Sequence, residues 1–153
     1  MSEIKFNKSL ILKLNKEKNN TEVLSTLAEY LCKHGLVKDT YKNAILSREE
    51  EYPTGLFTGN INIAIPHTDI QHVNQAAICV GILENPVKFH AMDNPGKKID
   101  VSLIIMLALT EVHGHVNMLQ KVIELIQNQK LVKEIIQSNN SKTIYKVIKE
   151  QLL

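Results

Sequence analysis

Apolar residues in this chain recur at two spacings, which predict strands in some segments and helices in others. Alternating apolar residues at the end of 4–14, namely Leu10, Leu12 and Leu14, predict a half-buried strand. Uninterrupted apolar runs predict strands buried on both faces. These runs lie at 63–65, 76–83 and 101–109, and a separate short apolar segment lies at 87–89.

Apolar residues three and four positions apart predict five amphipathic helices. Their ends are expected at residues that supply a side-chain acceptor for the first N–H groups, or at glycine and proline. The helices are expected from an N-cap at Asn20 or Thr21 to Gly35, from an N-cap at Asp39 to just before Pro53, from Val116 onward, over 131–136, and from an N-cap at Ser141 to the C-terminus.

Strands mixed with helices along the whole chain predict an α/β fold, with a single mixed β-sheet flanked by helices on both faces. At least one strand pair is expected to be antiparallel, because several connections are too short for a crossover. The 153 residues contain no repeat or linker, so one domain over 1–153 is expected.

Composition narrows the function classes. The 18 basic and 16 acidic residues nearly balance and the lysines are dispersed, which gives nucleic-acid binding no support. The apolar run 101–109 is much shorter than the roughly 20 residues that span a bilayer. The N-terminus lacks the apolar stretch of a signal peptide, and Cys32 and Cys79 lie in apolar contexts without metal or redox spacing. A cytoplasmic protein with buried, inert thiols is therefore expected.

The strongest candidate for chemistry is the stretch 62–69, where an apolar strand stops at Pro66 and is followed by His67. Proline has no N–H to donate, so the strand is expected to leave the sheet there and present the imidazole at its edge. His115 lies at the start of the helix predicted from Val116, where unpaired N–H groups and the helix dipole favour an anion. A phosphate suits such a site, with His67 as nucleophile.

Two simpler interpretations compete with this one. A histidine after a strand is more often a loop residue whose ring is hydrogen-bonded. The second interpretation is a metal site formed by His113 and His115 together with His67, His72 or His90. However, no carboxylate or cysteine completes a recurrent zinc spacing. We therefore expect no metal and no cofactor, and expect His72 and His90 to be surface or loop residues.

Four segments carry a further signal: Arg48-Glu49, Pro53-Thr54-Gly55, Ile63-Ala64-Ile65-Pro66-His67, and the stretch 115–122. Together they resemble enzyme IIA of the bacterial phosphoenolpyruvate-dependent sugar phosphotransferase system, in its fructose/mannitol class. The Tyr-Pro-Thr-Gly-Leu stretch at 52–56 and the Pro-His-Thr-Asp stretch at 66–69 are most similar to the galactitol-type subgroup. The resemblance extends from about Thr21 to the end.

The resemblance implies a phosphoryl carrier. His67 would accept phosphate from the phosphocarrier protein HPr and pass it to a cysteine of enzyme IIB, which serves a membrane enzyme IIC. His115 corresponds to the second histidine of the family, with His113 as the alternative. Arg48 and Thr54 would contact the phosphoryl group. The transported sugar would be galactitol or a related sugar.

Two questions stay open at this point. Asp69 either orients the ring of His67 or only begins a turn. The chain is either a transport carrier or a regulatory domain in which phosphorylation of His67 is a switch, as in the nitrogen-related branch of this system. The lack of any DNA-binding or membrane segment favours the carrier.

Overall fold

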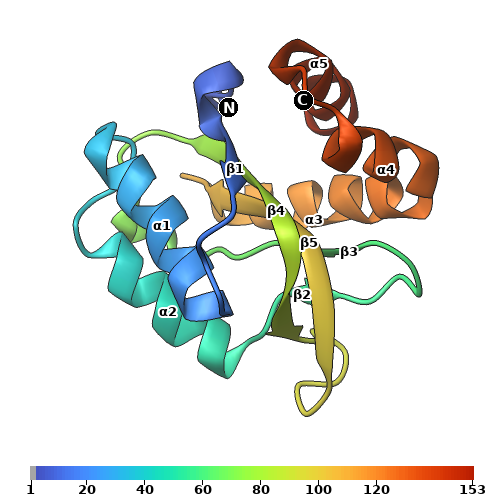
Figure 1. Ribbon diagram of the computed structural model, residues 1–153. Coiled ribbons are helices and arrows are strands. Elements are labelled where there is room, and N and C mark those ends of the chain that lie inside the picture. Colours follow the sequence, from blue (N-terminus) through green and yellow to red (C-terminus); the bar gives the residue numbers. More distant parts are fainter. Residues whose placement is uncertain (1–2) are drawn as a thin grey trace.

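A five-stranded mixed sheet forms the centre of the computed structural model, which describes residues 3–153 (Figure 1). The strand order is β1-β4-β5-β3-β2. The β1·β4 and β3·β5 pairs are parallel, whereas β4·β5 and β2·β3 are antiparallel. The predicted single mixed sheet is therefore confirmed. The strands are β1 Ile11–Leu14, β2 Gly55–Leu56, β3 Asn62–Ala64, β4 Ala77–His90 and β5 Lys98–Ala108.

Helices flank the sheet on both sides, as predicted (Figure 1). The first two helices pack together beside β4, and the last three gather at the opposite side. The helices are α1 Asn20–Lys33, α2 Tyr41–Glu51, α3 Val112–Gln127, α4 Gln129–Gln137 and α5 Ser141–Leu152, with short 3-10 turns at η1 Lys8–Leu10 and η2 Ile70–His72.

Two predicted strands have different extents. The strand expected over 4–14 is reduced to β1, because the Asn7 side chain accepts the N–H of Ser9 at 2.9 Å and turns the chain into η1. The segments 76–83 and 87–89 belong to one strand, β4. A register shift between Ile82 and Val87 leaves Glu84, Asn85 and Pro86 exposed and unpaired with β5, which accommodates Pro86 within a strand.

Three predicted N-caps were wrong by one position. Asn19 caps α1 by accepting the N–H of Glu22 at 2.9 Å, and Asn140 caps α5 by accepting that of Lys142 at 2.9 Å. Thr40, rather than Asp39, precedes α2. The neighbouring residues all have suitable side chains, so composition alone did not choose between them. Gly35 ends α1 as predicted, with a φ of 73° that favours glycine.

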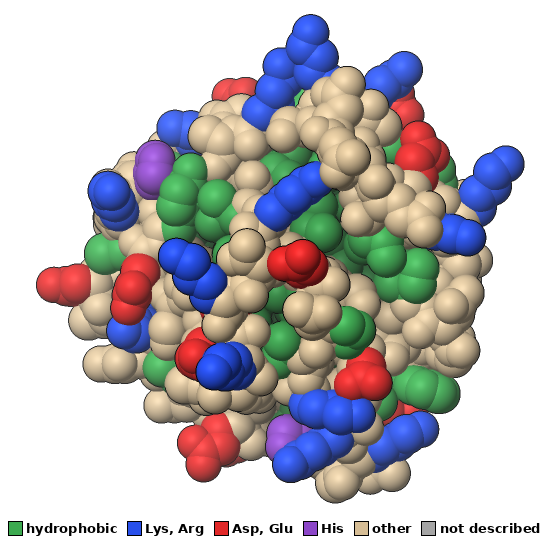
Figure 2. Space-filling model, viewed as in Figure 1, with side chains coloured by type: hydrophobic (Ala, Val, Ile, Leu, Met, Phe, Trp, Pro, Cys, Tyr) green, Lys and Arg blue, Asp and Glu red, His purple; other side chains and the backbone are tan. Residues whose placement is uncertain are grey.

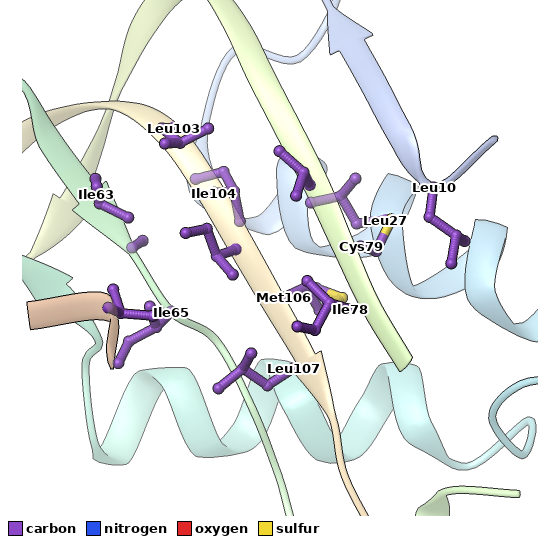
Figure 3. Packing of buried hydrophobic residues seen from close by; sticks show 14 of the residues in the cluster. Leu10, Leu27, Ile63, Ile65, Ile78, Cys79, Leu103, Ile104, Met106 and Leu107 are labelled. Carbon is purple, nitrogen blue, oxygen red and sulfur yellow. The ribbon is translucent and has the colours of Figure 1, made fainter. Parts of the chain in front are cut away.

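The core lies on both faces of β4 and β5. Burial on both faces explains why the sequences of these strands are continuous apolar runs. Figure 3 shows Ile63 and Ile65 beside Leu103 and Leu107 of β5, in one cluster of buried residues. Cys79 belongs to this cluster, and burial raises the pKa of its thiol to about 12. Cys32 is only partly buried.

The surface carries charges of both signs. Basic and acidic side chains are interspersed on the face shown in Figure 2. Among residues 3–153, no helix is both long enough and apolar enough to cross a membrane.

A backbone hydrogen bond joins the end of β3 to β5 in spite of the proline. Pro66 lacks an N–H, but its carbonyl accepts the N–H of Leu107 at 3.0 Å. In a continued parallel ladder, the Leu107 carbonyl would then accept the N–H of Thr68. The hydroxyl of Tyr41, on α2, donates to that carbonyl instead, at 2.8 Å and fully buried. Tyr41 therefore completes the ladder where the chain leaves the sheet.

We expect Tyr41→Phe to lower the free energy of unfolding by about 1–3 kcal/mol, because it leaves the buried Leu107 carbonyl without a donor. Urea denaturation measures the change. The control is Tyr145→Phe, since the Tyr145 ring stacks on Phe6 with centroids 5.5 Å apart and keeps that contact without its hydroxyl. Equal losses in the two variants would contradict a specific role for the Tyr41 hydroxyl.

Candidate functional site

His67 lies at the carboxyl end of β3, between β5 and β2, and its backbone is held on both sides. The N–H of Ile65 donates to the Thr54 carbonyl at 3.3 Å, while the Pro66 carbonyl is bound to β5. The strand therefore fixes the two residues before His67, and the half-buried ring lies at the mouth of a cleft.

The ring of His67 has one nitrogen engaged and one free to react. Nδ1 lies 2.9 Å from the Ile65 carbonyl oxygen. A carbonyl only accepts, so Nδ1 carries the proton and Nε2 carries the lone pair. Burial lowers the pKa of His67, with the positive charge of Arg48 adding to the effect, while the Ile65 bond and Asp69 oppose it. The neutral imidazole is therefore favoured at neutral pH.

His115 lies against this ring. The centroids of the two imidazoles are 5.0 Å apart, with an angle of 34° between the planes. Burial, and then the nearby His67 and Arg48, lower the pKa of His115 to about 4, although Asp69 opposes the shift. The pair is therefore two neutral rings rather than a pair of cations.

The helix that carries His115 begins at Val112, four positions earlier than predicted. Val112 lies four positions before Val116 and so continues the apolar spacing of the helix, but the residues between them are two histidines and a glycine, which do not mark a helix. His113 lies two positions before His115, about 200° around the helix, and lines a separate small cavity with Ile4 and Lys121. The structure thus brings His115, and not His113, to His67.

Arg48, near the end of α2, is the single arginine in a chain with many lysines. Its guanidinium carbon lies 5.1 Å from the centre of the Tyr52 ring, and Nη1 lies 3.6 Å from a carboxylate oxygen of Asp69. A guanidinium offers a planar fork that matches the oxygens of a phosphoryl group, which a lysine does not. The lone arginine is a signal that residue counting would have found.

Within the described residues, two buried side-chain nitrogens have no hydrogen-bond partner, Arg48 Nε and His115 Nε2. Buried polar atoms are normally paired, since an unmade bond costs about 1–3 kcal/mol. Both of these atoms belong to residues that line the same cleft. The cleft therefore has unused donor or acceptor capacity around His67.

The cleft has a volume of about 550 Å³ and a largely apolar rim. The side chains of Val112 and Val116 at its edge are 65% and 57% exposed. The cleft is lined by Arg48, Ile65, His67, Thr68, Asp69, Ile70, Leu107, Val112, His115, Val116 and Leu119.

Thr54 is not among the residues that line the cleft. It is buried, and its hydroxyl and N–H donate to the two carboxylate oxygens of Glu49, each at 2.7 Å. Its own carbonyl accepts the N–H of Ile65, so its contact with the site runs through the backbone. A direct contact of Thr54 with a phosphoryl group stays a prediction.

Glu49 is a supporting residue that sequence reasoning missed. Burial raises the pKa of its carboxyl, and the two bonds from Thr54 oppose the shift. Glu49 looks like part of a charged run, but it follows Tyr41 and Ile45 at helical spacing, and all three are buried. That spacing was a signal that one position of the run faces the core.

Asp69 orients neither the His67 ring nor the next turn through its side chain. The Nδ1 of His67 faces Ile65 instead, and the Asp69 carboxylate makes no capping bond to η2. Its backbone does begin that turn, because its carbonyl accepts the N–H of His72 at 3.3 Å. The carboxylate is left facing Arg48.

The remaining histidines of the metal alternative point to other partners. His72 Nδ1 lies 2.8 Å from the Thr40 hydroxyl, and His90, the last residue of β4, has Nδ1 2.7 Å from the Pro95 carbonyl. In the part of the chain that is described, no three His, Cys, Asp or Glu side chains are grouped to hold a metal ion.

Comparison with known proteins agrees with this geometry. The galactitol-specific EIIA component of Escherichia coli K12 is 30% identical over 118 residues, which cover 77% of this chain and 78% of that protein. A nitrogen regulatory protein of Klebsiella oxytoca is 27% identical over 135 residues, covering 88% and 79%. The fold matches enzyme IIA of mannitol in its complex with phosphorylated enzyme IIB from Escherichia coli, with a TM-score of 0.78, 18% identity and coverage of 96% and 99%.

The model of one protein family covers residues 5–151 of the chain. Its description is "Phosphoenolpyruvate-dependent sugar phosphotransferase system, EIIA 2". The chain therefore belongs to the type 2 EIIA family of the sugar phosphotransferase system and is a phosphoryl carrier of that kind.

Proposed function

We propose that the chain, acting over 1–153 as one enzyme IIA domain, accepts a phosphoryl group from HPr on His67 and passes it to the cysteine of a cognate enzyme IIB. The observation that carries the proposal is the free Nε2 of His67 beside the two unpaired buried nitrogens of Arg48 and His115. A reactive nitrogen and unused polar groups thus meet in one cleft.

In the first step the lone pair of His67 Nε2 attacks the phosphorus of the donor phosphohistidine. The donor P–N bond breaks as the new P–N bond forms, and no proton needs to leave His67, because Nδ1 already carries it. The ring gains positive charge as it becomes phosphorylated. The Ile65 carbonyl, 2.9 Å from Nδ1, stabilises that charge through its hydrogen bond.

Arg48 and His115 supply the environment of the transferred group. A phosphoryl group carries up to about two negative charges, which the guanidinium offsets. His115, as a neutral ring, donates a hydrogen bond through Nε2 without adding a second cation. Both residues therefore act on charge that is present only during and after transfer.

The second step reverses the first toward a different acceptor. A thiolate of enzyme IIB attacks the phosphorus, the P–N bond to His67 breaks, and the ring returns to its neutral form with Nδ1 still protonated. The open cleft and the exposed valines on its rim suit an acceptor that two macromolecules reach in turn. The relay runs in the cytoplasm, and its enzyme IIB serves a membrane enzyme IIC for galactitol or a related sugar.

A second candidate is a regulatory domain that uses phosphorylation of His67 as a switch. The similarity to nitrogen regulatory proteins supports it, at 27% identity. The carrier is favoured by the higher identity to the galactitol-specific component.

We expect His67→Ala to take up no label from phosphoenolpyruvate, enzyme I and HPr, because the accepting nitrogen is gone. His115→Ala should still be labelled, but on the order of 100- to 1000-fold more slowly, since it loses one donor to the transferred group. Label uptake is followed in a time course. His113→Ala is the matched control on the same helix and should keep the wild-type rate. Labelling of His67→Ala would refute the assignment.

The carrier and the switch differ in the fate of the label. Phosphorylated protein mixed with a purified galactitol-type enzyme IIB should lose its phosphate to the enzyme IIB cysteine within the mixing time of the assay. The control is enzyme IIB with that cysteine changed to serine. Retention of the phosphate on His67 in the presence of the intact partner would favour the switch.

Stability should fall as the pH is lowered through the range in which unfolded histidines become charged. The pKa values of His67 and His115 in the folded chain lie below the ordinary 6.5, and that of His115 is about 4. As the pH falls below about 6.5, these histidines therefore bind protons in the unfolded chain before they do in the folded chain, which favours unfolding. For His115 this loss of stability continues down to about pH 4. Urea denaturation across this range, beside NMR titration of the rings, measures it. His115→Gln should flatten the pH dependence, and His113→Gln serves as the control. A titration midpoint of His115 near 6.5 would contradict the expectation.

A further inference from the structure

The carboxylate of Asp69 faces Arg48, the single cationic side chain among the residues that line the cleft around His67. Its oxygen lies 3.6 Å from Arg48 Nη1, and the residue lies two positions after His67 at the lip of the same cleft. The carboxylate makes no capping bond and lies against the guanidinium instead. A carboxylate at an anion-binding site repels the anion, and its presence here therefore weakens the binding of a phosphoryl group.

Arg48 cannot fully neutralise both the Asp69 carboxylate and a phosphoryl group on His67. The guanidinium carries a single positive charge, its carbon lies 5.1 Å from the centre of the Tyr52 ring, and its Nη1 already faces Asp69 at 3.6 Å. Before transfer, Arg48 and Asp69 form a neutral pair. After transfer, one guanidinium faces a carboxylate and a phosphoryl group of up to about two negative charges. In the phosphorylated state two anions therefore share one positive charge, and they also repel each other.

We propose that Asp69 sets how strongly His67 holds its phosphoryl group, by competing with that group for Arg48. The inference rests on the proposed acceptor role of His67. Asp69 is a positioning residue, since it acts through Arg48 and through its charge rather than by touching the reacting nitrogen. Its effect is to favour the unphosphorylated chain, so that the phosphoryl group leaves more readily for the next thiolate.

The test is the equilibrium of phosphoryl exchange between HPr and the chain. The donor P–N bond breaks as the bond to His67 Nε2 forms, and both phosphoproteins are quantified at equilibrium. Asp69→Asn should shift the equilibrium constant toward the phosphorylated chain by about three- to tenfold, the range of an exposed ion pair or somewhat above it. The shift should shrink at high salt, because Asp69 is 69% exposed.

Asp100→Asn is the matched control. Asp100 is 59% exposed and pairs with Lys88 at 2.8 Å, near the end of β5 that lies opposite the cleft. The same substitution there removes the same charge, and should leave the exchange equilibrium unchanged. A shift of equal size in both variants would mean that net charge alone is responsible, and would overturn the proposal.

Two further variants separate charge from structure. Asp69→Glu keeps the carboxylate and should remain within about twofold of wild type, whereas Asp69→Ser removes it and should shift in the same direction as Asp69→Asn. NMR titration gives a readout that a structural role would not move. The Asp69 carboxylate raises the pKa of His67, so its removal should lower that pKa further.

The outcomes distinguish the two proposals. Labelling that persists in His67→Ala, or no labelling of wild type, would refute the acceptor role itself. Normal labelling at His67 with an unchanged equilibrium in Asp69→Asn and Asp69→Ser would refute only the role of Asp69.

Discussion

The hydrogen bond between His67 Nδ1 and the Ile65 carbonyl is the contact on which the chemistry of the cleft depends. It selects the tautomer, and with it the nitrogen that faces the cleft. The carbonyl is itself held, because Ile65 donates to Thr54 and Pro66 accepts from Leu107. The orientation of the reactive ring thus derives from backbone bonds of a buried sheet, which move less than side chains.

Around that ring, the cleft keeps the histidines uncharged and also places a positive charge near them. Burial keeps both imidazoles neutral, which suits nucleophilic attack, while Arg48 provides the positive charge that the transferred group requires. A second cation in the cleft would lower the histidine pKa values further and hold the anion more tightly. Asp69 offsets part of the positive charge, so the cleft is suited to passing an anion on rather than to storing it.

The strands of the core could be predicted from the sequence because burial on both faces leaves uninterrupted apolar runs. Helix starts were less accurate, since neighbouring residues such as Asn19 and Asn20 are equally able to cap, and since the first turn of α3 contains a glycine between two histidines. For the site, the strand stop at Pro66 and the predicted helix start indicated His67 and His115, and the family resemblance added Arg48. The pairing of His115 with His67 and the contact between Asp69 and Arg48 depend on chain crossings that spacing does not encode.

Gly55 has a consequence for the loop that follows it. A Cβ there would lie 2.6 Å from the His90 carbonyl oxygen, and the Gly55 carbonyl accepts the N–H of Met92 at 2.8 Å. Gly55 is thereby held between β3 and the β4–β5 connection, just before the loop 57–61 begins. A change of length in the exposed part of that loop, before Ile61, should therefore leave Thr54 and Ile65, and with them the backbone that carries His67, in place.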